Sequence, residues 1–290
     1  MIFPSTFSIV ACDLDKEAWG VAVASKFPAV GAVVPWAQAE TGAIATQSFA
    51  NTSFGPRGLD MLASGLSAEG TLSRILADDP DREHRQVGIV DSHGGSATFT
   101  GNVCFSWAGG VIGPGYAIQG NILASDQVVP AMRRTFLETK GELPERLYKS
   151  LLAGDQSGGD RRGRQSAAIY VVKPKGGYGG YNDRWVDYRV DDHPDPVLRL
   201  GELLTLHTLY FGKSLVSERL PLNGSALIQL QKILSQQGYY KGPLHGQLDE
   251  ATRITLEAFI GNENFEERCN LDAGWIDQPV YDYLLKKFGK

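Results

Sequence analysis

Three short segments of the 290-residue chain carry side chains that could do chemistry. Thr6 is a hydroxyl residue that opens an apolar run, and a hydroxyl becomes a good nucleophile only when a base lies beside it. Residues 160–164, Asp-Arg-Arg-Gly-Arg, form a dense basic cluster whose arginines could bind a carboxylate through two parallel hydrogen bonds. Residues 191–195, Asp-Asp-His-Pro-Asp, could supply metal ligands or cap a helix. Because contiguous ligands rarely converge on one ion unaided, we expect the cap, with no metal or other cofactor.

The elements that must position these residues begin with a β-hairpin. Residues 6–13 and 19–26 are apolar runs joined by the polar turn 14–17, a pattern typical of a hairpin. Further strands are predicted at 29–39, 41–49, 86–91, 96–100, 116–119, 166–172 and 184–190. Helices are predicted at 56–64, 68–77, 124–139, 144–152 and 196–211. Strands, then helices, then strands again indicate an α+β fold.

A second domain is predicted beyond residues 212–224, where Lys, Ser, Pro and Asn gather between apolar helices. We place the boundary between domains 1–215 and 216–290. Residues 226–238 form an amphipathic helical run that ends on a capping glycine, and 250–260 form a second helix. The apolar surfaces of these two helices are predicted to comprise Leu227, Leu230, Ile233, Leu234, Ile254, Leu256 and Phe259.

The composition excludes several broad classes of protein. The net charge is −5 and basic residues form no long stripe, so we expect no nucleic-acid partner. No run approaches the roughly 20 apolar residues that span a bilayer, so we expect no membrane partner. The first five residues lack the basic and apolar regions of a signal peptide, which predicts a cytoplasmic protein. Cys12, Cys104 and Cys269 have no paired spacing, which favours free thiols.

Seven segments together resemble a known family. They are TFSIVA from residue 6, GVAVASKFPAVG from 20, GAIATQSFANTSFGPRGLDML from 42, REHRQVGIVD from 82, GYAIQGNIL from 115, GGDRRGRQSAA from 158 and DDHPDPVLRL from 191. This set is similar to the DUF1028 family of predicted amidohydrolases in the N-terminal nucleophile (Ntn) hydrolase superfamily. The resemblance implies a four-layer αββα sandwich and hydrolysis of a C–N bond in a small amide or peptide-like substrate. It also implies that Thr6 is the nucleophile and that its own freed amine is the base.

The tail has a resemblance of its own. The pattern GYYKGPLHGQLDEATRITLEAF from residue 238 is similar to the peptidoglycan-binding three-helix module of bacterial wall enzymes. This implies a small all-α domain and a peptidoglycan fragment as partner, with a packing or oligomerising role as the alternative. We also expect a homo-oligomer, because sandwiches of this kind commonly bury a helical face against a second copy.

The resemblance implies further site residues on the second strand of the hairpin. Residues 24–26 lie where proteasome-type relatives carry an Asp-Ser-Arg triplet near the nucleophile. Ser25 is therefore a substrate-binding candidate, and Lys26 is a catalytic candidate whose charge could activate a neighbouring amine or hydroxyl. Ala24 replaces the acid of the triplet, which removes the usual charge relay. Lys26 could equally be a surface lysine with its stem packed on the protein.

Residues 44–48 correspond to the strand-to-helix turn that forms the oxyanion hole in the superfamily. Thr46 and Gln47 are the catalytic candidates there, because donors must point at the charge that develops during reaction. Asn51 is a candidate contact for a substrate amide. As an alternative, Asn51 could simply cap the helix that follows.

The basic cluster contributes the remaining candidates. Asp160 could orient the amine of the nucleophile, while Arg164 and Ser166 could bind substrate, and the alternative is an internal Arg–Asp network that holds the loop. Asn121, at a strand end, could face a ligand or cap a helix. Gly163 stands where the proteasome-type pattern has a serine.

Two functions remain open from the sequence. In the first, cleavage of the Ser5–Thr6 peptide exposes the amine of Thr6 and yields an active amidohydrolase. In the second, the chain is a catalytically silent module that binds muropeptides or a small amide on the same scaffold. Ala24 and Gly163 favour the second, because they replace an acid and a serine.

Overall fold

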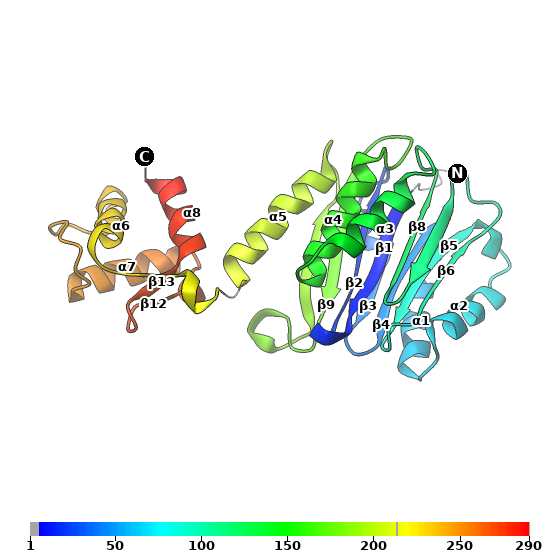
Figure 1. Cartoon of the computed structure of the whole chain (residues 1–290), viewed down its shortest axis with the longest axis horizontal. Helices are drawn as coiled ribbons and strands as arrows, with labels where there is room; N and C mark the ends of the chain where they lie inside the picture. The colour runs from blue at the N-terminus through cyan, green and yellow to red at the C-terminus, as the bar shows by residue number, and fades with distance from the viewer. Residues whose placement is uncertain (1–5, 213, 290) are drawn as a thin grey trace. The chain divides into compact units, whose positions relative to one another are not determined.

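The computed structural model describes residues 6–212 and 214–289 and divides the chain into two units, Met1–Leu204 and Thr205–Lys290 (Figure 1). The Ser5–Thr6 peptide, whose cleavage the sequence comparison implies, involves Ser5 and therefore lies outside the described residues. The two units are described separately.

A six-stranded antiparallel sheet forms the centre of the first unit, in the order β10-β9-β2-β1-β8-β7. Its strands are β1 (Thr6–Asp13), β2 (Ala18–Ser25), β7 (Gly109–Gly113), β8 (Tyr116–Asn121), β9 (Ser166–Val172) and β10 (Arg184–Val190). The predicted hairpin is confirmed, because β1 and β2 pair along their whole length. These two strands are buried on both faces, which explains why their sequence is almost continuously apolar.

A second antiparallel sheet packs face to face with the first. Its order is β3-β4-β5-β6, with β3 (Pro35–Gln38), β4 (Gly42–Ser48), β5 (Arg85–Asp91) and β6 (Ser96–Thr100). Small and β-branched side chains from both sheets fill the space between them, among them Val10, Val21, Val23, Ala43 and Ala45. This interface is the inner core of the unit.

Helices cover the other face of each sheet (Figure 1). The helices α3 (Val128–Glu138) and α4 (Leu143–Gln156) pack on the six-stranded sheet, and α1 (Phe54–Ala63) and α2 (Ala68–Ala77) pack on the four-stranded sheet. The hydroxyl of Ser67 accepts a hydrogen bond from the amide of Gly70 and so caps α2, which begins at the predicted residue, Ala68. The prediction of mixed helices and antiparallel sheets is thus confirmed. The helix α5 (Pro196–Phe211) begins at the predicted residue, and its Val197 and Leu200 are buried in the core between the six-stranded sheet and its helices.

Some predicted elements are corrected. The strand predicted at 29–39 is a 3-10 turn, Val30–Ala32, followed by the short β3, because Ala29 adopts a left-handed conformation with φ 51° that breaks the strand. Strand β7 was not predicted, since its Gly-Gly-Val-Ile-Gly sequence has too few apolar residues to show alternation. The helix predicted from residue 124 begins at Val128.

The second unit combines helices with a small sheet. The helices are α6 (Gly224–Gln236), α7 (Glu250–Asn262) and α8 (Gln278–Phe288), and the strands β11 (Arg219–Pro221), β12 (Cys269–Asn270) and β13 (Trp275–Asp277) pair in the order β11-β13-β12. The prediction of an all-α unit is therefore corrected. Most of the predicted apolar face is buried in one core, but Ile254 is 57% exposed and lies outside it.

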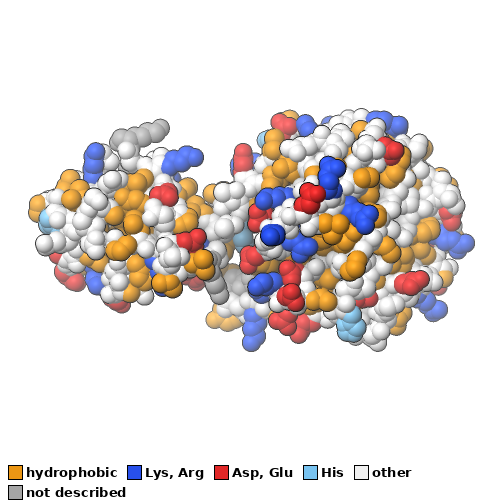
Figure 2. Space-filling view, viewed as in Figure 1, with side chains coloured by type: hydrophobic (Ala, Val, Ile, Leu, Met, Phe, Trp, Pro, Cys, Tyr) orange, Lys and Arg blue, Asp and Glu red, His pale blue; other side chains and the backbone are white. Residues whose placement is uncertain are grey.

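None of the helices within residues 6–212 and 214–289 has the length and apolar character needed to cross a membrane. Acidic and basic side chains are interspersed on the visible face (Figure 2).

The three cysteines are free thiols, and burial raises the pKa of Cys12 to about 12, so this thiol stays protonated.

Candidate functional site

A row of polar side chains crosses four strands at the end of the sheet where β1 begins. Thr6 pairs with Asn121 of β8 on one side and with Ser25 of β2 on the other, and Ser25 pairs with Ser166 of β9. Directly paired residues of antiparallel strands point to the same face, so these four side chains all face the second sheet. All four are buried, and Thr6 is 0% exposed. The fold thus brings together four of the predicted site residues from distant parts of the sequence.

The hydroxyl of Thr6 has another hydroxyl as its neighbour. Thr6 Oγ1 donates to Ser25 Oγ at 3.3 Å, and the carbonyl oxygen of Thr6 accepts from Gln47 Nε2 at 3.3 Å. Ala24 precedes Ser25 at the position of the missing acid and is buried in the core on the other face of the sheet. A proton acceptor for Thr6 must therefore come from a group other than residue 24.

Directly beside this row, a network of buried amides joins the two sheets. Gln47 Oε1 accepts from Ser8 Oγ at 2.5 Å, and Gln119 Nε2 donates to the same hydroxyl at 2.6 Å. Gln86 Oε1 accepts from Gln47 Nε2 at 2.8 Å and from Asn121 Nδ2 at 3.0 Å. Gln47 therefore reaches Thr6 through its side chain, as part of a network that holds the sheets in register. The sequence analysis missed Ser8, Gln86 and Gln119, although each is a single polar residue inside an apolar strand.

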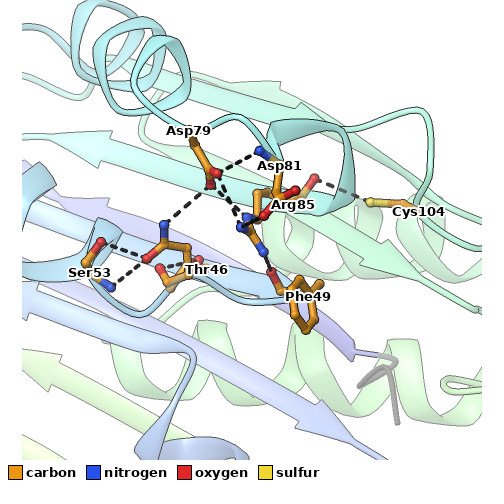
Figure 3. Close-up of polar contacts among 8 residues, drawn as sticks. Thr46, Phe49, Ser53, Asp79, Asp81, Arg85 and Cys104 are labelled. Carbon is orange, nitrogen blue, oxygen red and sulfur yellow. Dashed lines mark hydrogen bonds and ion pairs between the residues drawn. The ribbon is translucent and has the colours of Figure 1, made fainter. Parts of the chain in front are cut away.

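The predicted oxyanion-hole segment 44–48 lies within strand β4 rather than in a turn. The amide of Thr46 donates to the carbonyl of Val34 at 3.2 Å, and its hydroxyl donates to the carbonyl of Asn51 at 3.1 Å. Asn51 Oδ1 in turn accepts from the amide and the hydroxyl of Ser53, just before α1 (Figure 3). Thr46 and Asn51 thus stabilise the turn between β4 and α1, while the N-cap residue of α1 is Ser53.

A buried ion pair connects the loop after α2 to this turn. Arg85 Nε lies 2.7 Å from Asp79 Oδ2, and Arg85 Nη1 donates to the carbonyl of Phe49 at 2.6 Å (Figure 3). Both charged side chains are less than 10% exposed. The hydrogen bond from Arg85 holds the pKa of the Asp79 carboxyl below its usual range. The sequence analysis did not identify this pair.

Asp79→Asn is expected to destabilise the protein by about 3 kcal/mol at neutral pH, because it removes the closer of the two carboxylates that pair with the buried Arg85 guanidinium and leaves only the contact of 3.5 Å with the exposed Asp81. Since the pKa of Asp79 is lowered in the folded state, its contribution is present above the unfolded pKa of about 3.9 and is lost as the pH falls through the lower folded value. Urea unfolding at pH 7 and between pH 5 and pH 3 measures both effects.

Asp78→Asn is the matched control, because Asp78 forms an exposed ion pair with Arg57 and contributes at most about 0.5 kcal/mol. Equal losses of stability in the two variants would contradict a special role for Asp79.

Asp160 fixes the end of strand β2. Its Oδ2 accepts from the backbone amide of Lys26 at 2.7 Å and pairs with Arg162 at 3.0 Å, and Asp160 forms a β-bridge with Leu123. Lys26 itself is exposed, and its Nζ donates to the carbonyl of Arg164 at 3.3 Å. Asp160 therefore ties together the ends of β2 and β8 on both sides of Thr6.

Arg164 and Ser166 are occupied by contacts within the protein. Arg164 Nε lies 2.8 Å and 3.1 Å from the two carboxylate oxygens of Asp155, which raises the pKa of the guanidinium further. The internal Arg–Asp network that the sequence left open is thus present for Arg164. Ser166 Oγ donates to the carbonyl of Phe27 and accepts from the amide of Val30, so it shapes the loop after β2.

The segment 191–195 also serves the local structure. Asp192 accepts from Gln165 at 3.2 Å, and His193 Nδ1 accepts from the amide of Asp195 at 3.0 Å. Asp195 also lies 3.4 Å from Arg164. Within the described ranges, no three His, Cys, Asp or Glu side chains are grouped so as to hold a metal ion.

Two surface hollows of the first unit lie away from Thr6. One, of about 370 Å³, is lined by β7 and α3 residues that include Val111, Arg133 and Leu137. The other, of about 420 Å³, is lined by residues of β3, β9 and the start of β10, including Gln38 and Tyr170. The row at Thr6 is buried, and neither of these hollows is lined by its residues.

Comparisons with known proteins identify both parts of the chain. Residues 210–284 match the family model described as "Putative peptidoglycan binding domain", and residues 6–200 match the one described as "Family of unknown function (DUF1028)". The chain is similar to the crystal structure of protein SPO2555 from Silicibacter pomeroyi, which carries the same DUF1028 family model. That similarity has a TM-score of 0.64 and 30% identity, and it covers 70% of this chain and 86% of the other. No curated protein matches the sequence. The chain carries a peptidoglycan-binding-like domain at its C-terminal end and belongs to the DUF1028 family.

Proposed function

We propose that this protein hydrolyses a C–N bond in a small amide or peptide-like substrate, with Thr6 as the nucleophile once its amine is exposed. The observation that carries the proposal is the position of Thr6 at the first residue of a central strand, between Ser25 and Asn121. Two stacked sheets with helices on both outer faces support the finer assignment to the αββα sandwich of Ntn hydrolases.

In the proposed reaction, the free amine of Thr6 takes the proton of the Thr6 hydroxyl while Oγ1 attacks the substrate carbonyl. The C–N bond then breaks, and the leaving nitrogen receives that proton. A water molecule finally hydrolyses the ester on Oγ1, which releases the acid and restores the hydroxyl. Ser25 orients Oγ1 through the contact of 3.3 Å, and Asp160 holds the adjoining strand end.

The proposed mechanism requires cleavage of the chain before Thr6. An amine that lies inside the Ser5–Thr6 peptide cannot act as a base, because its nitrogen is part of the amide bond. Cleavage of that peptide would supply the base. Mass measurement of purified active protein tests this directly, because a fully active chain that retains Met1 excludes the free-amine mechanism.

The second candidate function is a silent binding module on the same scaffold. It is favoured by Ala24 and by the hydrogen bonds that already occupy Gln47, Arg164 and Ser166. A panel of amides, lactams and muropeptides distinguishes the two functions. Specific binding of one of these compounds without any product would show that the protein is a binding module and not a hydrolase.

For the second unit we propose that it binds a peptidoglycan fragment, with the family model as the main support. The loop 238–246 carries Tyr239, Tyr240 and His245, whose rings could stack on sugars if they were free. Tyr240 is buried and donates to the carbonyl of Pro243. Tyr239 packs against Phe259, and His245 lies 3.1 Å from Asp249. These contacts make the loop a rigid surface rather than a set of free rings.

Removing residues 223–290 is expected to lower turnover of muropeptides while leaving turnover of small amides intact, if the second unit delivers substrate. Light scattering of the same truncated chain reports on the homo-oligomer that we also propose, to which exposed Leu198 of α5 could contribute. Unchanged rates on both substrates together with an unchanged oligomeric state would exclude both the delivery role and the assembly role.

A further inference from the structure

Basic residues lie next to the ends of both strands that neighbour Thr6. The amide of Arg161 donates to the carbonyl of Ile122 at 3.0 Å, and Ile122 directly follows Asn121, the strand partner of Thr6 on β8. Lys26 directly follows the strand partner on β2, Ser25. Lys26 therefore lies one residue beyond the Thr6 row on the β2 side. On the β8 side, the backbone of Arg161 lies next to Ile122, which is also one residue beyond the row.

These two cations are the ones whose charge the local acids leave uncompensated. Asp160 pairs with Arg162 at 3.0 Å, and Arg164 pairs with Asp155. In the part of the chain that the structure describes, no carboxylate forms an ion pair with Arg161 or Lys26, and both side chains are exposed. The end of the sheet at Thr6 thus carries two exposed positive charges that attract an anion.

We propose that the substrate carries a free carboxylate and that Arg161 binds it, with Lys26 adding a second positive charge. The substrate class is that of N-acylated amino acids and short peptides, in which a carboxylate lies a few bonds from the scissile C–N bond. The planar guanidinium of arginine matches the two oxygens of a carboxylate in a bidentate arrangement. This inference rests on the proposed function, because it assigns the substrate of the same site.

The structure also explains why Arg161, rather than its neighbours, has this role. Arg162 donates to both oxygens of Asp160, and Arg164 does the same with Asp155. Each of these two arginines already has a carboxylate of the protein in the place that a substrate carboxylate would take. Arg161, which precedes both of them in the sequence, has no such partner among the described residues.

Matched substrates test the proposal. Wild-type protein is assayed for release of the acyl group from a panel of N-acetyl amino acids and from the same compounds with the carboxylate converted to a carboxamide. We expect kcat/KM to be at least about 10-fold higher for the carboxylates. In Arg161→Met this preference should fall severalfold, to the smaller part that Lys26 supplies, mainly through a higher KM, and Arg161→Lys should retain more of it. Arg74→Met, which removes another exposed arginine on α2, is the control and should change neither rate.

The outcomes separate this inference from the proposed function. Turnover of both substrate sets at equal rates, or an equal loss on both in Arg161→Met, would refute the carboxylate assignment while the hydrolase stands. If no amide is turned over, calorimetry measures the binding of N-acetylalanine and of inorganic phosphate, which tests the carboxylate site by itself. If N-acetylalanine binds and Arg161→Met abolishes this binding, the carboxylate site stands although the hydrolase does not. Stronger binding of phosphate, or binding that does not depend on Arg161, overturns the inference.

Discussion

Thr6→Val is expected to lower kcat by a factor on the order of 10³ or more, because it removes the hydroxyl that forms the covalent intermediate. Valine has nearly the shape of threonine, so the buried site between Ser25 and Asn121 should keep its packing. The variant loses one hydrogen bond, of 3.3 Å, to Ser25, and its melting temperature should stay within a few degrees of wild type. Turnover of the substrate panel and thermal unfolding measure the two effects.

The same variant should also retain the residues before Thr6. If the Thr6 hydroxyl carries out the cleavage of the Ser5–Thr6 peptide, Thr6→Val protein keeps its full mass, whereas wild-type and Thr6→Ser protein lose the leading residues. Thr41→Val is the matched control, because Thr41 is also buried and its hydroxyl donates to the carbonyl of Ala39 at the far end of β4. Wild-type rates in Thr6→Val would remove Thr6 from the mechanism, and a loss of activity in Thr41→Val would show that the effect is not local.

Local features of the sequence predicted much of the fold. The β1–β2 hairpin was predictable because two apolar runs flank a short polar turn, and the start of α2 because Ser67 caps it. Strand β7 was not predictable, because its glycines hide the apolar–polar alternation of a strand. It is a strand because it pairs with β8. The small sheet of the second unit was missed because its strands have only two or three residues.

The candidate site was predictable only as far as motifs mark it. The residues Thr6, Ser25, Asn121 and Ser166 were all nominated, and pairing across four strands places them in one row. The contacts that occupy them could not be predicted, because they join segments far apart in the sequence. Whether Arg164 faces a substrate or Asp155 depends on how the end of α4 packs, and this is a property of the tertiary structure. Arg161 became the stronger candidate only after the partners of its neighbours were known.

Gln86→Leu is expected to destabilise the first unit by about 3 kcal/mol, since it removes the centre of the buried amide network. Gln86 donates to the hydroxyl of Thr100 and to the carbonyl of Gly120, and it accepts from Gln47 and Asn121. Leucine has a similar volume but removes these four hydrogen bonds. Thermal unfolding should show a decrease in melting temperature of about 10 °C.

Gln38→Leu provides the control for this variant, because Gln38 lies exposed on strand β3 and the same substitution there should change stability by no more than about 0.5 kcal/mol. The network also connects stability to chemistry, since Gln47 holds the carbonyl of Thr6 and Gln86 holds Gln47. Gln86→Leu protein that remains folded at low temperature should therefore turn over substrate more slowly, through a lower kcat, because the Thr6 backbone is less firmly positioned. A variant that loses stability but keeps the wild-type kcat would limit the network to holding the two sheets together.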